Sequence, residues 1–347
     1  MNLPIRPLGV SGLELTTVGF GAWALGGGGW AGGWGAQDDS ASLATMHHAI
    51  DLGINWIDTA AVYGLGHSEE LVGQLLRELA PEDRPLVFTK CGLVWNEANR
   101  LEPAKQILRP DSIRAECEAS LRRLGVECID LYQFHWPDET GVAVEASWET
   151  MLRLMEEGKI RAVGVSNFEV PLLERCERLR HVDSLQPPFS LIRRSVAAKE
   201  IPWSAMHATG VICYSPMGSG LLTETFTADR VKTLPPDDWR RGSARFQSPQ
   251  IDRSLALRDA LIPIARRYDT TVGAVAVAWV LAWPGVTGAI VGARTPQQVD
   301  GWIRAADLSL TRADLDEIAE AIHRTGAGEG PVHPNGARFA AASRAET

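Results

Sequence analysis

The sequence predicts a (β/α)8 TIM barrel that is preceded by a β-hairpin and carries extra helices. Three observations support this fold class. Short apolar strands alternate with helical patterns along the chain, several strands end in polar side chains, and 347 residues with 45% hydrophobic content can bury one large core. We therefore expect residues 1–347 to form a single barrel domain, with a flexible tail from about residue 325 because that stretch has little to bury.

The strands are predicted from apolar runs bounded by glycine, proline and polar residues. Two runs at 5–8 and 13–16 flank a turn at 9–12 that contains two glycines, which is typical of a hairpin. The eight barrel strands are then expected at 17–23, 55–60, 86–90, 129–135, 162–165, 184–186, 211–213 and 288–292.

Helices are predicted where apolar residues recur at helical spacing. They are expected at 38–52, 68–79, around 113–124, 143–157, 169–180, before Gly210, at 255–268, 271–283 and 312–323. Thr295, Pro296 and Gln298 have the spacing of a capping box, which predicts a further helix that begins at Pro296. Three long segments are expected outside the strands and helices: 25–37 as a rim loop, 94–109 as a lid or rim loop beside the site, and 223–253 as a long excursion off the barrel.

Composition excludes several classes of partner. The net charge is −9 and the arginine pairs are scattered, so we expect no nucleic-acid binding. Five widely spaced cysteines suggest neither disulfides nor a metal site, and His47 and His48 have no ligand-spaced partner, so a helix-surface position is expected for both. No signal peptide and no bilayer-spanning run appear, so we expect a cytoplasmic protein without membrane contact, as a monomer or weak homo-oligomer.

A glycine-rich stretch after the first strand has the spacing of a dinucleotide fingerprint, at Gly27, Gly29 and Gly32. The context argues against a Rossmann fold, because no helix begins at the last glycine and the following acid, Asp51, falls near a helix end. We expect a rim loop instead, whose tryptophans either line a pocket or pack on one another.

Chemically useful side chains follow the predicted strands. Asp58, Lys90 and His135 follow strands two to four, with Tyr63 just beyond Asp58. Taken alone, Asp58 could cap a turn, Tyr63 could anchor a loop, and His135 could be structural. Because the carboxyl ends of barrel strands share one rim, we expect these groups to meet there. A second set follows strands five to eight: Ser166, Asn167, Gln186, Tyr214 and Arg294.

The chain resembles aldo-keto reductases from the hairpin to Asp300. The matching stretches are Asp58-Thr-Ala-x-x-Tyr63-Gly-x-Gly-His-Ser-Glu-Glu70, Thr89-Lys90, Asp130-Leu-Tyr-Gln-x-His135, Gly164-Val-Ser-Asn-Phe168, Gln186, Tyr214-Ser-Pro216 and Gly292-Ala-Arg294. Within the family it is most similar to the bacterial general-stress and sugar-aldehyde reductase branch, through Trp23-Ala, His135-Trp136-Pro-Asp138 and Arg294-x-Pro296. It departs from the family at Glu224-Thr225, where Gly-Lys is usual, and at Phe189-Ser190, where Tyr-Asn is usual.

The resemblance implies a catalytic set of Tyr63, Asp58, Lys90 and His135. Tyr63 would donate a proton to a carbonyl that receives hydride from a reduced nicotinamide. A free tyrosine, with a pKa of about 10, is a poor acid-base catalyst near neutral pH, so we expect Lys90, oriented by Asp58, to lower the pKa of Tyr63. His135 would orient the carbonyl.

The resemblance also implies the binding residues. The cofactor-binding set is Gly21, Ala22, Trp23, Asp58, Ser166, Asn167, Gln186, Tyr214, Ser215, Pro216, Met217, Gly220, Gly292, Arg294 and Gln298, and the substrate-binding set is Trp23, Tyr63, His135 and Trp136. Arg294, beside a helix start, would suit the 2′-phosphate of NADP, which implies that NADPH is preferred over NADH. The alternative is that Arg294 is a surface charge and Gln298 only a helix cap.

We therefore expect an NADPH-dependent reductase of aromatic, short-chain or sugar aldehydes, or of ketones. The alternative is an NADP-binding redox-sensor subunit on the same fold, similar to the β subunits of potassium channels. The absence of an extension before the hairpin and of an obvious docking surface favours the enzyme. The rim segments decide the substrate, and the sequence does not specify how they close.

Overall fold

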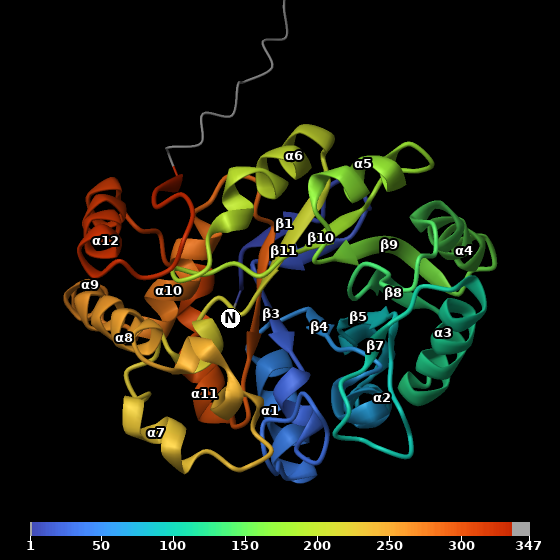
Figure 1. Cartoon of the computed structure of the whole chain (residues 1–347), viewed down its shortest axis with the longest axis horizontal. Coiled ribbons are helices and arrows are strands. Elements are labelled where there is room, and N and C mark those ends of the chain that lie inside the picture. Colours follow the sequence, from blue (N-terminus) through green and yellow to red (C-terminus); the bar gives the residue numbers. More distant parts are fainter. Residues whose placement is uncertain (1, 335–347) are drawn as a thin grey trace, which may run out of the picture.

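Eight parallel strands form a closed barrel in the computed structural model, which describes residues 2–334 (Figure 1). In order around the barrel they are β3 (Val18–Gly21), β4 (Trp56–Asp58), β5 (Leu86–Cys91), β8 (Ile129–Phe134), β9 (Ile160–Ser166), β10 (Ser184–Gln186), β11 (Gly210–Tyr214) and β12 (Gly288–Gly292). Gly21 of β3 lies opposite both Asp58 and Gly292, so the first strand closes the ring. The predicted fold class is confirmed.

The predicted hairpin is also confirmed, as β1 (Ile5–Pro7) paired antiparallel with β2 (Glu14–Thr16). Its leucines pack on side chains inside the barrel, in a cluster that includes Leu8, Leu15, Trp56 and Phe88. Trp56 is fully buried, and its indole nitrogen donates to the carbonyl oxygen of Thr16 at 2.9 Å. The hairpin therefore closes the end of the barrel at which the strands begin.

Twelve α-helices in residues 2–334 lie around the barrel and beyond its rim (Figure 1). They are α1 (Asp39–Asp51), α2 (His67–Glu78), α3 (Pro110–Leu124), α4 (Val144–Glu156), α5 (Val170–Glu177), α6 (Glu200–His207), α7 (Ala228–Thr233), α8 (Gln250–Ala260), α9 (Ile262–Arg267), α10 (Val272–Leu281), α11 (Pro296–Asp300) and α12 (Arg312–Thr325). The main apolar core lies between the barrel and these helices. In this part of the chain, no helix has both the length and the hydropathy to cross a membrane.

Several helix predictions differ from the structure in their bounds, and two of them are informative. The helix expected at 255–268 is two helices, α8 and α9, and α8 begins earlier, at Gln250. Pro263 lies at the start of α9, where its missing N–H and its ring prevent one continuous helix. The helix predicted at 68–79 is α2, which begins one residue earlier, at His67. Ser68 therefore lies inside the helix, and its hydroxyl donates to the carbonyl of Ala22.

The predicted capping box at α11 is also wrong. The side chain of Thr295 accepts no hydrogen bond from the helix, and Oε1 of Gln298 accepts the backbone N–H of Arg294 at 2.7 Å. Gln298 therefore reaches past Thr295 to the residue before it. A true capping box occurs at α12, between Thr311 and Asp314.

The rim segments contain more structure than the sequence predicted. The segment at 94–109 includes a small hairpin, in which β6 (Leu93–Val94) pairs antiparallel with β7 (Lys105–Gln106). The segment at 223–253 includes α7 and runs from there toward the loop before α1 (Figure 1). The backbone N–H of Trp239 donates to the carbonyl of Gly33, so these two rim segments touch.

The expected tail is ordered at its start. The backbone N–H of Arg194 donates to the carbonyl of Glu329, and its buried guanidinium donates to the carbonyls of Ala327 and Gly330. These bonds hold residues 327–330 against the barrel, so a tail that is flexible from 325 is wrong for this stretch. Residues 335–347 lie outside the described part of the chain.

Candidate active site

Asp58 and Lys90 form a buried ion pair at the rim. Nζ of Lys90 donates to Oδ1 of Asp58 at 2.6 Å and to the carbonyl of Thr59 at 2.8 Å. Burial lowers the pKa of Lys90, and the carboxylate of Asp58 partly offsets that effect. Each of the two charges is therefore stabilised by the other, because both side chains are buried away from water.

Tyr63 follows β4 on a 3-10 turn, Tyr63–Gly66, and lies beside this pair. Nζ of Lys90 is 5.2 Å from the centroid of the Tyr63 ring. Burial, followed by the negative charge of Asp58, raises the pKa of Tyr63 well above its usual value. The expected lowering of this pKa by Lys90 is therefore not seen in this structure, in which burial and the charge of Asp58 set the direction of the shift. The phenol stays protonated and can donate.

His135 follows β8 and faces Tyr63. The two rings meet edge to face, with centroids 5.6 Å apart. Burial, together with the positive charge of Lys90, lowers the pKa of His135 well below its usual value. The imidazole is therefore neutral near pH 7 and can donate one N–H to a bound oxygen.

The two predicted sets of rim residues form one network. Nε2 of Gln186 donates to Oδ2 of Asp58 at 2.8 Å, so Asp58 connects Lys90 to the set of residues that follows strands five to eight. The amide of Asn167 donates to the carbonyl of His135 at 2.9 Å, and the phenol of Tyr214 donates to Oδ1 of Asn167 at 2.8 Å. The hydroxyl of Ser166 donates to the carbonyl of Gln186 at 2.8 Å.

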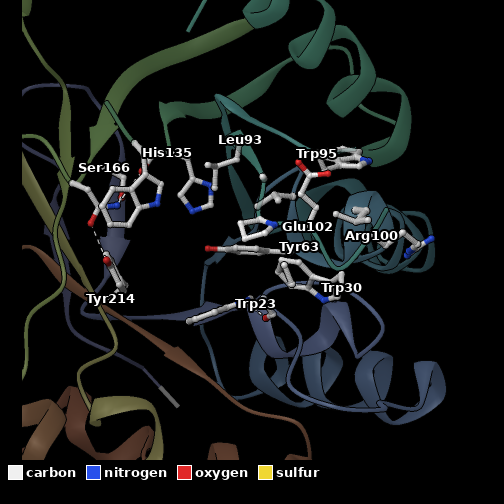
Figure 2. Close-up of a pocket in the computed structure, with 18 of the residues that line it drawn as sticks. Trp23, Trp30, Tyr63, Leu93, Trp95, Arg100, Glu102, His135, Ser166 and Tyr214 are labelled. Carbon is white, nitrogen blue, oxygen red and sulfur yellow. Dashed lines mark hydrogen bonds between the residues drawn. The ribbon is translucent and has the colours of Figure 1, made fainter. Parts of the chain in front are cut away.

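Two cavities meet at Tyr63. The smaller, about 330 Å³, is the pocket shown in Figure 2, and the larger is a groove of about 700 Å³. Trp23, Tyr63 and Tyr214 line both. In the view of Figure 2, the Tyr63 ring lies between Trp23 on one side and His135 and Leu93 on the other. A proton donor thus stands where the two spaces join.

Most predicted site residues line one of these cavities. The groove is lined by Gly21, Trp23, Asp58, Tyr214, Ser215, Pro216, Met217, Gly220, Gly292, Arg294 and Gln298. The pocket is lined by Trp23, Tyr63, His135, Trp136, Ser166, Asn167, Gln186 and Tyr214. Ala22 and Lys90 line neither, because Ala22 is buried in the core and Lys90 lies beneath Asp58.

Comparison with known proteins identifies the family of this chain. The model of the Aldo/keto reductase family matches residues 17–323. This chain belongs to the aldo/keto reductase family.

Its relatives include aldo-keto reductase YhdN of Bacillus subtilis, 34% identical over 91% of this chain and 92% of that protein. The NADH-specific methylglyoxal reductase of Escherichia coli is 34% identical over 92% of this chain and 99% of that protein. The solved structure of glycerol dehydrogenase AKR11B4 from Gluconobacter oxydans is 38% identical, with a TM-score of 0.83, and the match covers 94% of this chain and 97% of that one.

Arg294 of this reductase does not point freely into the groove. Nε donates to Oε1 of Gln37 at 2.6 Å, and the terminal nitrogens donate to the carbonyls of Trp34, at 3.2 Å, and Ala36. Arg294 is therefore more than a surface charge, since it holds the loop at 34–37 against the end of β12. Gln298 lines the groove and accepts the backbone N–H of Arg294.

Several residues of the reductase site were missed from the sequence. In the groove, Gln37, Arg230 and Arg240 join the wall, and Arg240 pairs with buried Asp238 at 2.6 Å. The guanidinium of Arg240 lies 4.4 Å from the centroid of the Trp34 ring. These groups come from rim segments without strong periodicity, so no sequence signal placed them.

The two family departures have different outcomes. Oε1 of Glu224 accepts the backbone N–H of Val272 at 2.6 Å, so this carboxylate lines the groove while it caps the start of α10. Phe189 is buried against Trp279 and Trp283, with ring centroids 5.4 and 5.3 Å away, and lines neither cavity.

Proposed function

We propose that this aldo-keto reductase uses NADPH to reduce aldehydes and ketones to alcohols, with Tyr63 as the proton donor. The single observation that carries the proposal is the meeting of the groove and the pocket at a protonated tyrosine. The groove has room for an extended cofactor, and the pocket has room for a small carbonyl compound. A bound reduced nicotinamide would supply the hydride at this junction.

The polar side chains at the junction fit a carboxamide. Asn167 uses both amide hydrogens, on His135 and Ser166, and its oxygen accepts from Tyr214. Gln186 has one bond, from Nε2 to Asp58, which leaves its second N–H and its carbonyl oxygen available. We infer that Gln186 binds the carboxamide directly, while Ser166 and Asn167 either hold Gln186 and His135 in place or exchange partners when the cofactor binds.

The roles of the residues in proton transfer follow from their charge states. The neutral imidazole of His135 would donate to the carbonyl oxygen and position it beside Tyr63. The phenol would then deliver its proton, and the positive charge of Lys90 would stabilise the phenolate left behind. Asp58 keeps Lys90 charged and in place, and it holds Gln186 at the same time.

The proposed preference for NADPH rests on the arginines that line the groove. They are Arg230, Arg294 and Arg240, of which Arg240 is paired with buried Asp238. A 2′-phosphate could replace Gln37 and the carbonyl of Ala36 as the partner of Arg294, because a phosphate matches the guanidinium fork and adds charge. Cofactor preference differs within the family, since the Escherichia coli relative is named NADH-specific.

The walls of the pocket favour an apolar or aromatic substrate. The indole nitrogens of Trp23, Trp30 and Trp95 donate to Gly32, Gly27 and Glu97, respectively. Their hydrogen-bonding groups are therefore already satisfied within the rim segments. What remains for a substrate is ring surface, which binds flat apolar groups well.

A consumption assay tests the proposal. Oxidation of NADPH and NADH is followed with aromatic aldehydes, short aldoses and methylglyoxal, for the native protein and for Tyr63→Phe. We expect turnover with NADPH that exceeds that with NADH and a loss of turnover in the variant. Binding of NADPH with no turnover of any of these carbonyls would support the redox-sensor alternative, and equal turnover by Tyr63→Phe would remove this tyrosine from the mechanism.

A further inference from the structure

Two adjacent residues in the first turn of α2, Ser68 and Glu69, are fully buried, although both residue types are mostly exposed in proteins. The hydroxyl of Ser68 lies 2.9 Å from the hydroxyl of Thr59. Oε1 of Glu69 accepts the hydroxyl of Thr89 at 2.5 Å. Each threonine is the direct neighbour in the chain of one member of the buried ion pair. The start of α2 is therefore bonded to both strand ends that carry this pair.

The bond of Ser68 closes the base of the loop at 60–67, which carries Tyr63. The single proton of the Ser68 hydroxyl goes to the carbonyl of Ala22 at 3.1 Å, so Thr59 is the donor in the bond between the two hydroxyls. The carbonyl of Thr59 accepts Nζ of Lys90 at 2.8 Å. Thr59 therefore contacts both the end of the Tyr63 loop and the ammonium group beside it.

The loop at 60–67 is strained and depends on its surroundings. Leu65 has a φ of +57°, a conformation that leucine rarely adopts. The neighbouring Gly64 approaches another segment so closely that a Cβ on it would lie 2.5 Å from the carbonyl oxygen of Gly26. Strained backbone persists only where the contacts around it hold it in place. We therefore expect the loop to rearrange if the bond at its base is lost.

The bond of Glu69 fixes the end of β5. Its second carboxylate oxygen, Oε2, accepts Nε of Arg123, on α3, at 2.6 Å. Glu69 thus accepts one bond from a hydroxyl and one from a cation, and bonds to a buried carboxylate are strong. Because Glu69 and Ser68 are neighbours in one helical turn, α2 sets the separation between the end of β4 and the end of β5.

We propose that Ser68 and Glu69 are positioning residues for proton transfer. Acting through the two threonines, they hold the loop of Tyr63 in place relative to the end of β5. Neither lines the pocket or the groove, so neither meets substrate or cofactor. The effect on catalysis rests on the proposed function. The effect on the loop does not, because it is measured without substrate.

Kinetics of Ser68→Ala and Glu69→Gln test the role in proton transfer. We expect kcat for benzaldehyde to fall roughly 10- to 100-fold, because a small displacement of the proton donor is costly. The solvent deuterium isotope effect on kcat should rise above the native value, since proton transfer becomes the slow step. NADPH affinity should change less than about threefold. A lower kcat with an unchanged isotope effect would indicate a merely structural role and would overturn the proposal.

Variants at Thr59 test whether Ser68 acts through it. Thr59→Val has nearly the same shape but no hydroxyl, so it should match Ser68→Ala. The double variant should lose little more than either single variant, because both changes remove one bond. Thr59→Ser keeps the hydroxyl and should restore most of the native kcat and isotope effect. Losses that simply multiply in the double variant would show that the two residues act separately.

Two control variants have matched chemistry. Ser204 is also fully buried, but its hydroxyl donates to the carbonyl of Glu200 within its own helix, α6. Glu70 is in the same turn as Glu69, but it is exposed and lies 3.7 Å from His67. Ser204→Ala and Glu70→Gln should keep the native kcat and isotope effect. Losses in these controls as large as those in the test variants would contradict the assignment.

Hydrogen exchange tests the loop without substrate. The N–H groups of Tyr63 and Leu65 donate to the carbonyls of Ala60 and Val62 within the loop. At one pH, we expect these amides to exchange several-fold faster in Ser68→Ala than in the native protein or in Ser204→Ala. Amides 89–92, at the end of β5, should do the same in Glu69→Gln.

The two proposals fail in different ways. If no carbonyl is turned over, the proposed function fails, and exchange still decides whether α2 holds the loop. Native exchange rates in Ser68→Ala and Glu69→Gln would overturn the role of α2 whatever the enzyme reduces. If Ser68→Ala does not fold, as judged by circular dichroism, Thr59→Val removes the same bond and takes its place in both experiments.

Discussion

At the scale of single residues, Asp58 is the centre of the site. One carboxylate oxygen holds Lys90 and the other holds Gln186. A residue that could have been a simple turn cap thus connects the group that stabilises negative charge with the group proposed to bind the carboxamide. Its burial makes both bonds strong, because water does not compete for them.

Tyr63→Phe tests the proton donor. The substitution removes the phenolic oxygen and keeps the ring, so we expect kcat for carbonyl reduction to fall by about 10²- to 10⁴-fold. NADPH affinity, measured by titration of protein fluorescence, should change less than about threefold, because the ring that packs on Trp23 is retained. A large loss of NADPH affinity would contradict this assignment.

Arg294→Ala tests the phosphate assignment. Loss of a charge-assisted pair should weaken NADPH by about 1.5–3 kcal/mol, or roughly 10- to 150-fold in Kd, as measured by calorimetry. NADH should weaken less, but not by zero, because Arg294 also holds the loop at 34–37. Arg312→Ala is the matched control, since Arg312 pairs only weakly with Asp316 on α12. Equal losses for the two cofactors would leave Arg294 as a loop anchor alone.

At the scale of elements, the turn after β8 and the hairpin formed by β6 and β7 both contribute residues to the wall of the pocket. Trp136 lines only the pocket, whereas Trp23 lines both the pocket and the groove. Trp23 also stacks on Tyr63 and Trp239, with ring centroids 6.1 and 5.4 Å away. Changes at Trp23 would therefore mix substrate and cofactor effects.

Trp136→Ala is the cleaner test of the aromatic wall. Loss of one ring contact should reduce transition-state binding of a benzaldehyde by about 1–3 kcal/mol, roughly a 5- to 150-fold drop in kcat/KM. The drop for glyceraldehyde should be much smaller, and NADPH affinity should be unchanged. An equal loss for both substrates would mean that Trp136 supports the turn at His135 and is not a wall of the pocket.

At the scale of the whole molecule, barrel closure depends on Trp56 and the absence of a side chain at position 19 next to it. A Cβ on Gly19 would lie 2.1 Å from the Trp56 ring, and that ring also bonds to the hairpin. The first and second strands of the barrel can approach there only because position 19 is glycine.

Gly19→Ala should therefore lower the free energy of unfolding by about 1–3 kcal/mol or more, through overpacking against a fully buried ring. Urea unfolding followed by circular dichroism measures the change. Gly242→Ala is the control, because a Cβ at position 242 would meet no atom of residues 2–334 within 4 Å apart from its chain neighbours and the backbone of its own turn, and the backbone there is not left-handed. Equal stability of the two variants would show that the barrel end can relax around Trp56.

The sequence alone determined the barrel, the hairpin and the strand-end position of the polar residues. Periodicity is local, and the right-handed βαβ connection leaves few ways to arrange eight units, so local patterns sufficed. The family motifs add the expected role of each rim residue. Arg294 is an exception: the sequence predicted its position after the eighth strand but gave no sign of its hydrogen bonds to the loop at 34–37.

Only the tertiary structure decided the electrostatics and the walls of the site. The pKa of Tyr63 rises because the phenol is buried and lies near the negative charge of Asp58, and neither fact is visible in a strand that ends in lysine. Glu69 and Glu70 were two similar acids at the start of a helix until folding buried Glu69 against Thr89. Burial and distance between remote segments set both properties, and these arise only when the chain is folded.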